Sequence, residues 1–241
     1  MDLAIQWCTY LIGLPLELLT IRAMLRGGLR EYPFVFSYLV ASFLTTVAEM
    51  PASLAFYRNR RNRQAAIDYA WWYWHDEAIL TVLVFVLVIS LIYHGTARLE
   101  SRRSVRLGLI TGAVLFAGIS FAIHYRTPGP TESYALWASL WTRDFKLCAA
   151  ILDMALWLIL LAARTKDRRL LTLSWALGIM FAGEAIGESV RNLATPTKFH
   201  LLADGGGVIS ILADLTFFYV TWRVFRVAGG KAGATESRVA C

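Results

Sequence analysis

Charged residues are scarce in this chain of 241 residues, because only 17% of them are Asp, Glu, Lys or Arg. Soluble domains carry about 25% charged residues, so a water-exposed globular protein is a poor match. Hydrophobic residues make up 57% of the sequence, and the mean hydropathy is +0.52. The composition therefore predicts that lipid, rather than water, surrounds much of the protein surface.

Cysteine, histidine and the common nucleotide-binding or hydrolytic motifs are also rare or missing. The three cysteines form no CxxC pair and no disulfide framework, and the four histidines form no HxxxH pair. The sequence contains no P-loop, no GxGxxG fingerprint and no GxSxG nucleophile elbow. These absences remove the usual sequence support for a nucleotide-binding enzyme or hydrolase, and the cofactor, if there is one, stays unknown.

The stretch from Trp71 to Tyr93 shows most clearly what kind of protein this is. It contains no charged residue from Ala78 onward, and only Thr81 and Ser90 in that part are polar. A helix needs roughly 20 residues to cross the hydrocarbon core of a bilayer. The four aromatic residues at 71–74 would then lie at headgroup level, where amphipathic rings are enriched. We predict a transmembrane helix with an aromatic, acidic end.

Seven apolar runs of spanning length follow one another along the chain. They are residues 3–25, 34–56, 71–94, 107–124, 145–163, 170–190 and 206–226. The pattern predicts an all-α, polytopic integral membrane protein, with a seven-transmembrane-helix bundle at 1–227 and a flexible cytoplasmic tail at 228–241. Whether the second run fully spans stays open, because the basic stretch that follows it also fits a re-entrant segment.

The distribution of Lys and Arg predicts the orientation. With the N-terminus outside, 15 of the 24 Lys and Arg residues fall on the inner side and 9 on the outer side. This bias favours an outside N-terminus and a cytoplasmic C-terminus. The basic run Arg58–Arg63 lies on the outer side and opposes the bias. The short basic loops are typical of a bacterial inner (cytoplasmic) membrane protein, and their position between apolar runs argues against nucleic-acid binding.

Charged side chains inside the predicted spans mark the candidate site, because such groups face a cavity or a partner rather than lipid. The predicted ligand- or ion-binding residues are Glu49, Asp76, Lys146, Asp153, Glu184, Glu188, Arg191 and Asp214. Nearly all of them fall in the outer half of the predicted bundle. This convergence predicts an outward-facing acidic and aromatic cavity. The alternative is a set of isolated buried pairs, such as Glu188 with Arg191 and Lys146 with Asp153.

Three functions fit this pattern. The first is binding or transport of a small solute or cation in the cavity. The second is a membrane-embedded, metal-dependent enzyme that uses His75 and His124, and the third is a non-catalytic scaffold or assembly subunit. A retinal protein is disfavoured, because the last span contains no lysine before Lys231. The lipid bilayer is the expected partner, and the sequence leaves open a second copy of the chain or a separate signalling partner.

Two pairs of glycines have the spacing that lets membrane helices approach closely. They are Gly108 with Gly112 and Gly183 with Gly187. Small residues four apart leave one side of a helix without side-chain bulk. We expect both pairs to pack inside the protein, and the second would place Glu184 and Glu188 at a crowded helix crossing.

Overall fold

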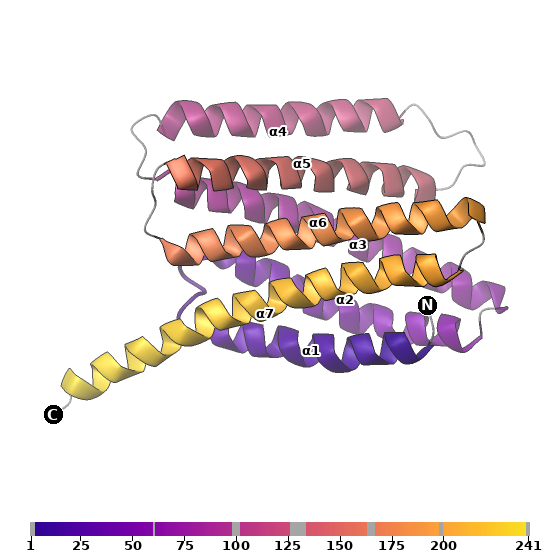
Figure 1. Cartoon of the computed structure of the whole chain (residues 1–241), viewed down its shortest axis with the longest axis horizontal. Helices are drawn as coiled ribbons and strands as arrows, with labels where there is room; N and C mark the ends of the chain where they lie inside the picture. Colours follow the sequence, from indigo (N-terminus) through magenta and orange to yellow (C-terminus); the bar gives the residue numbers. More distant parts are fainter. Residues whose placement is uncertain are drawn as a thin grey trace. The chain divides into compact units, whose positions relative to one another are not determined.

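A computed structural model describes the backbone of residues 3–59, 61–97, 102–125, 134–162, 167–197 and 200–239. It describes side chains over 7–59, 61–97, 103–123, 141–162, 167–191 and 204–226. The described residues form seven α-helices and no strand. They are α1 (Leu3–Leu25), α2 (Pro33–Arg58), α3 (Arg63–Gly95), α4 (Arg102–Tyr125), α5 (Tyr134–Ala162), α6 (Arg168–Thr197) and α7 (His200–Val239) (Figure 1).

All seven helices are long and apolar enough to cross a membrane, with mean hydropathies between 1.4 and 2.4 over their most apolar windows. The predicted all-α, seven-span architecture is therefore confirmed. Helices suit this environment because each one satisfies its own backbone hydrogen bonds without water. The second run forms one continuous helix of 26 residues, so a re-entrant segment is not needed to explain it. Helix α7 continues through 228–239, and the flexibility of that tail stays a prediction.

Local sequence signals set the helix ends. Asn62 caps α3, because its side-chain oxygen accepts hydrogen bonds from the backbone N–H groups of Gln64 and Ala65. Asp167 does the same for α6 through the N–H groups of Arg169 and Leu170. Helix α3 therefore begins at Arg63, eight residues before the predicted span, and it is 33 residues long.

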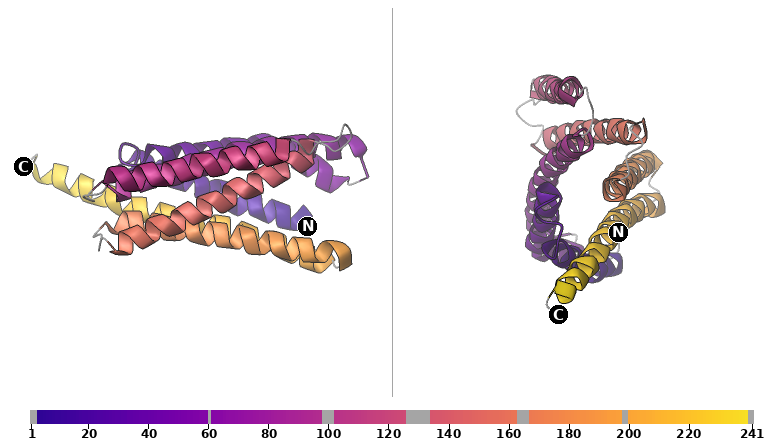
Figure 2. Two further views of the ribbon diagram at one scale, coloured as in Figure 1. Left: turned by 90° about the horizontal axis from the view of Figure 1, so that it is seen from above. Right: turned by 90° about the vertical axis from the view of Figure 1, so that its left-hand side faces the viewer.

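The chain divides into two compact units. The first comprises Met1–Phe43 with Trp175–Cys241, and the second comprises Leu44–Ser174. In the first unit, α1 packs against α7, and Thr20 Oγ1 donates to the Phe218 carbonyl oxygen across that contact. In the second unit, α5 lies between α3 and α4 (Figures 1 and 2). Each unit is described separately below.

Close helix packing in the first unit depends on glycine. A Cβ at Gly183 would collide with the Ala213 Cβ, and one at Gly187 would collide with Ser210 Oγ. The predicted tight crossing at this glycine pair is therefore confirmed, with α7 as the partner helix. The other pair behaves differently, because nothing lies within 4 Å of a Cβ built at Gly108 or Gly112. For these two glycines, the prediction of packing inside the protein is wrong.

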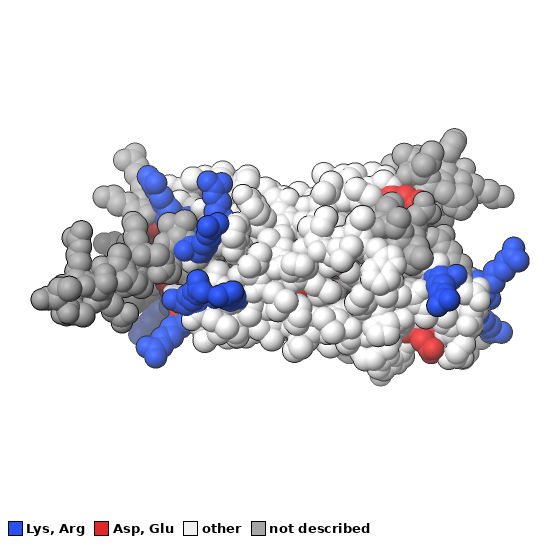
Figure 3. All heavy atoms as spheres, turned by 90° about the horizontal axis from the view of Figure 1, so that it is seen from below, with Lys and Arg blue, Asp and Glu red and all other residues white. Residues whose placement is uncertain are grey.

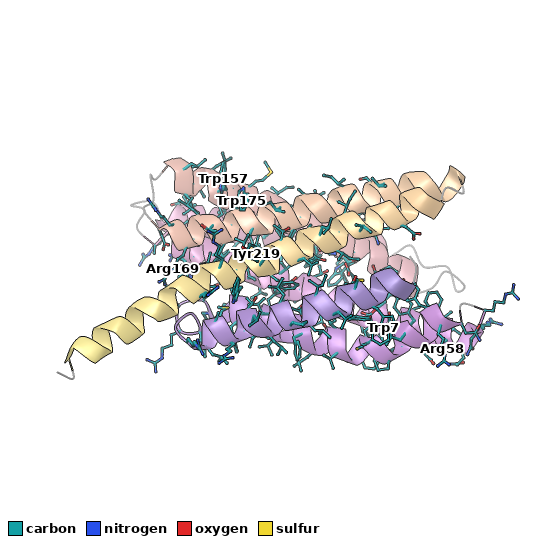
Figure 4. All side chains as sticks on the ribbon, turned by 60° about the horizontal axis from the view of Figure 1, so that its bottom comes forward. Trp7, Arg58, Trp157, Arg169, Trp175 and Tyr219 are labelled. Atoms are coloured by element: carbon teal, nitrogen blue, oxygen red, sulfur yellow. The ribbon has the colours of Figure 1, made fainter. Side chains whose placement is uncertain are left out.

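Charged side chains are concentrated near the helix ends, as expected for a protein whose central part lies in lipid (Figure 3). Figure 3 shows Lys and Arg side chains gathered near the helix ends, with few charged groups on the face between them. Exposed aromatic residues lie toward the same ends. In the second unit, Trp157 and Arg169 lie near one end and Arg58 lies at the other (Figure 4). Exposed Trp residues near basic helix ends are typical of the lipid–water interface.

Candidate functional site

An ion pair between α3 and α5 lies at the centre of the polar groups in the second unit. The Nζ atom of Lys146 contacts Oε1 of Glu77, and about a quarter of each side chain is exposed. The sequence did not predict this pair, and the alternative of isolated buried pairs joined Lys146 to Asp153 instead. That pairing is wrong, because Lys146 faces α3. The spacing along α5 identified the face of the helix but not the neighbour on that face.

Two carboxyl groups meet beside this ion pair. The carboxyl groups of Glu49 on α2 and Asp76 on α3 are close enough to interact directly, and the Thr45 side chain also interacts with Asp76. A carboxylate can only accept, so a bond between two carboxyl groups requires that one of them carries a proton. The Oδ1 atom of Asp76 is buried and has no hydrogen-bond partner among the atoms that the structure describes. The Glu49–Asp76 pair therefore offers one buried acceptor that no described atom fills, and two carboxyl groups placed together favour sharing one proton.

Aromatic rings adjoin the carboxyl pair on the α2–α3 side. The ring of Phe56 stacks on Tyr69 with centroids 5.0 Å apart and planes 9° apart. Tyr57 and Tyr73 contact Tyr69 at 6.0 and 6.1 Å, and Tyr69 is close enough to Glu49 to interact with it electrostatically. Ring faces carry partial negative charge. Carboxyl groups and aromatic rings thus occur side by side in this unit, as the predicted composition of the site requires.

The charges of this cluster do not cancel. We define the α2–α3–α5 cluster as Thr45, Glu49, Asp76, Glu77 and Lys146. With one proton shared between Glu49 and Asp76, the cluster contains two carboxylates and one ammonium group. Its net charge is negative inside helices that are otherwise apolar. Uncompensated charge is expensive in such surroundings, so the shared proton should leave only when another cation takes its place.

Asp153 is deeper in the second unit and is already hydrogen-bonded. Ser174 Oγ donates to its Oδ1 at 2.8 Å, and the two residues are 1% and 3% exposed, respectively. Asp153 is seven residues beyond Lys146 on α5, which is about 10 Å along the helix. A comparable buried pair occurs in the first unit, where Ser42 donates to Glu17 at 2.8 Å. The sequence analysis did not predict that serine hydroxyl groups would donate hydrogen bonds to these buried acids.

The remaining predicted acids belong to the first unit. Glu184 and Glu188 on α6 and Asp214 on α7 are half-buried, and Arg191 is exposed. The Arg191 side chain lies against Gly206, since its Cγ is 2.9 Å from the position of a Cβ there. The crowded crossing beside Glu184 and Glu188 is present as predicted. Their part in a shared ligand site stays a prediction.

The structure describes the side chain of only one of the two histidines that were predicted to bind metal. The ring of His75 stacks on Trp71 with centroids 4.1 Å apart, and its Nδ1 is 2.7 Å from the Trp71 carbonyl oxygen. The His124 side chain lies outside the described residues. Among the described side chains, no three His, Cys, Asp or Glu residues are placed to hold one metal ion. A metal site at His75 and His124 stays a prediction.

Comparison with known proteins finds no relative of this chain. No family model, curated protein or solved structure matches the chain. The chemistry of the site therefore has to be inferred from its own residues.

Proposed function

We propose that this multi-pass membrane protein binds a small organic monocation, such as a protonated amine, at the α2–α3–α5 cluster and releases a proton as it does so. The observation that carries the proposal is the pairing of the Glu49 and Asp76 carboxyl groups beside the buried, unfilled Oδ1 atom of Asp76. A bound ammonium group would take the place of the shared proton and keep the charge of the cluster constant. Binding would thus be an exchange of one cation for another.

The surroundings of the carboxyl pair support an organic rather than a bare inorganic cation. The buried Oδ1 of Asp76 can accept an N–H bond from the ligand. Tyr69 interacts with Glu49 and stacks on Phe56, so the Tyr69 ring can cover the apolar part of the same ligand. Hydrogen bonds between charged groups are short and strong, and aromatic faces attract ammonium groups. Glu77 would stay paired with Lys146 and fix the relative position of α3 and α5.

Transport is the extension of this proposal. We place Asp153 as the next acceptor along α5, because it is a second buried carboxyl on the helix that carries Lys146. A role of Glu184, Glu188, Arg191 and Asp214 of the first unit in ligand binding stays a separate prediction. The proposed orientation keeps the N-terminus outside and the C-terminus in the cytoplasm of a bacterial inner membrane, so the cluster would open outward.

Calorimetry on the purified protein tests the proposal. Methylammonium, tetramethylammonium, sodium and potassium would be titrated into the wild-type protein and into Glu49→Gln. We expect methylammonium to bind most tightly, and Glu49→Gln to weaken binding at least about tenfold, since a charged hydrogen bond contributes about 1.5–3 kcal/mol. Glu31→Gln, in the turn after α1, is the matched control and should bind normally. Equal binding by Glu49→Gln and the control would contradict the proposal.

A scaffold subunit is the second candidate, and the two buried serine–carboxyl pairs favour it. The Ser174–Asp153 and Ser42–Glu17 bonds give one oxygen of each buried acid a donor without any ligand. If the protein only fixes helix packing, none of the four cations will produce a saturable heat of binding. The same acid substitutions would then lower the yield of folded protein and change nothing else.

A further inference from the structure

A groove of about 560 Å³ lies between the second half of α2 and the first turns of α3, within the second unit. Trp71 and Trp72 form one wall, and they are 53% and 39% exposed. Alanines supply much of the remaining lining, namely Ala48, Ala52 and Ala55 on α2 and Ala65 on α3. The volume falls in the range of about 300–1,000 Å³ that is usual for ligand pockets. Small side chains and ring walls suit an apolar chain.

The groove lies at the level of the lipid headgroups. Helix α3 has 33 residues and is thus about 50 Å long, whereas the hydrocarbon core is about 30 Å thick. About two fifths of the helix length, roughly 20 Å, therefore exceeds the thickness of the hydrocarbon core. The exposed pair Trp71 and Trp72 marks the interface, so the turns from Asn62 to Asp68 lie among headgroups.

Charges of both signs surround this groove. Arg58 follows Ala55 by three residues on α2 and thus continues the side of the helix that lines the groove. Arg61 is exposed in the turn between the two helices. Asp68 lines the groove itself, one turn before Trp72, and its Oδ1 accepts a 2.8 Å hydrogen bond from Gln64 Nε2. Cations thus stand near the mouth, and a carboxylate stands beside the aromatic wall.

We propose that the groove binds a phospholipid whose headgroup carries a primary ammonium group. Arg58 and Arg61 would hold the phosphate, and the acyl chains would leave the groove past Ala48 toward the hydrocarbon. The ammonium group would pair with Asp68 and lie over the Trp71 and Trp72 rings. A purely anionic lipid would satisfy the arginines but would bring no cation to Asp68. The site also accounts for a basic run on the side where the charge bias predicts few basic residues. This inference is independent of the cation site proposed above.

The test measures which lipid stays with the protein. The full chain would be reconstituted in bilayers of equal parts phosphatidylethanolamine, phosphatidylcholine and phosphatidylglycerol and then released in mild detergent. Native mass spectrometry would measure the mass of the protein together with the lipid that it retains. We expect phosphatidylethanolamine to be retained about tenfold over either of the others, which corresponds to about 1.4 kcal/mol. Asp68→Asn should abolish this preference, and Asp68→Glu, which keeps the charge, should restore it.

Paired arginine variants test the phosphate contact separately. Arg58→Gln combined with Arg61→Gln should lower the retention of all three lipids. Arg26→Gln combined with Arg30→Gln, at exposed positions in the α1–α2 turn, should leave retention unchanged. Retention of phosphatidylglycerol above phosphatidylethanolamine would overturn the proposed occupant. A preference that survives Asp68→Asn, or retention that is insensitive to Arg58 and Arg61, would overturn the site.

Discussion

Ser174 Oγ donates a 2.8 Å hydrogen bond to Oδ1 of Asp153, and the two residues are 1% and 3% exposed. The bond joins the first turns of α6 to the middle of α5. A carboxyl group at this depth has no interface to reach, so it depends on the donor that the neighbouring helix supplies. The pair therefore fixes how α6 begins against α5 in the second unit.

Removing this donor should destabilise the protein measurably. Interhelical hydrogen bonds in membranes contribute about 0.5–2 kcal/mol, so we expect Ser174→Ala to lower the free energy of unfolding by about 1–2 kcal/mol. Thr172→Ala is the control, because Thr172 is half-buried and its hydroxyl donates to the Arg168 carbonyl oxygen of its own helix rather than to a neighbouring helix. Denaturant unfolding in mixed micelles compares the two. Equal stability of the two variants would show that the Asp153 bond is energetically unimportant.

The crossing of α6 and α7 should be intolerant of any added methyl group. A Cβ at Gly187 meets Ser210 Oγ and the Gly206 carbonyl oxygen, so Gly187→Ala should cost about 1–3 kcal/mol through overpacking. Gly112→Ala has open space around it and should gain up to about 1 kcal/mol from helix propensity. Thermal denaturation in detergent should therefore shift in opposite directions for these two glycine variants. A shift of the same sign would contradict the described crossing.

These two glycine pairs also show what the sequence predicts and what it does not. The spacing at Gly183 and Gly187 correctly predicts a close helix crossing, and the same spacing at Gly108 and Gly112 does not. Lipid tails are as apolar as leucine side chains, so an apolar sequence cannot tell a helix neighbour from lipid. The seven spans are predictable because the length of apolar runs is fixed by the bilayer. The faces that meet are set by packing.

The candidate site was likewise predictable from the sequence only in part. Depth along each span correctly identifies Glu49, Asp76 and Lys146 as buried or half-buried groups in apolar helices. The partners were missed, because Lys146 pairs with Glu77 on α3 and not with Asp153 on its own helix. Helical periodicity gives the direction of a side chain only relative to its own helix axis. Which helix stands opposite is a property of the whole bundle.

The ion pair between Glu77 and Lys146 should tolerate exchange of its two charges. Glu77→Lys and Lys146→Glu should each lower thermal stability, because each places two like charges together. The double variant should recover much of the loss, with a coupling energy of about 0.5–3 kcal/mol between the two sites. A double-mutant cycle on unfolding free energies measures this term. Strict additivity of the two losses would mean that the pair contributes no interaction of its own.

Labelling from one side of the membrane tests the predicted orientation. In a variant without native cysteines, Arg61→Cys should react with a membrane-impermeant maleimide added outside intact cells, whereas Arg103→Cys should react only after lysis. Cys8 has to be replaced first because it is exposed, unlike the buried Cys148. The reverse labelling pattern would place the N-terminus in the cytoplasm and would turn the α2–α3–α5 cluster inward.

The proton count on ligand binding tests the central claim most directly. Methylammonium would be titrated calorimetrically into the wild-type protein in buffers that differ in ionisation enthalpy, which gives the number of protons released for each cation bound. The shared proton between Glu49 and Asp76 predicts a release of about one proton per cation, and Glu49→Gln should release none. Saturable binding by the wild-type protein without any proton release would contradict the account.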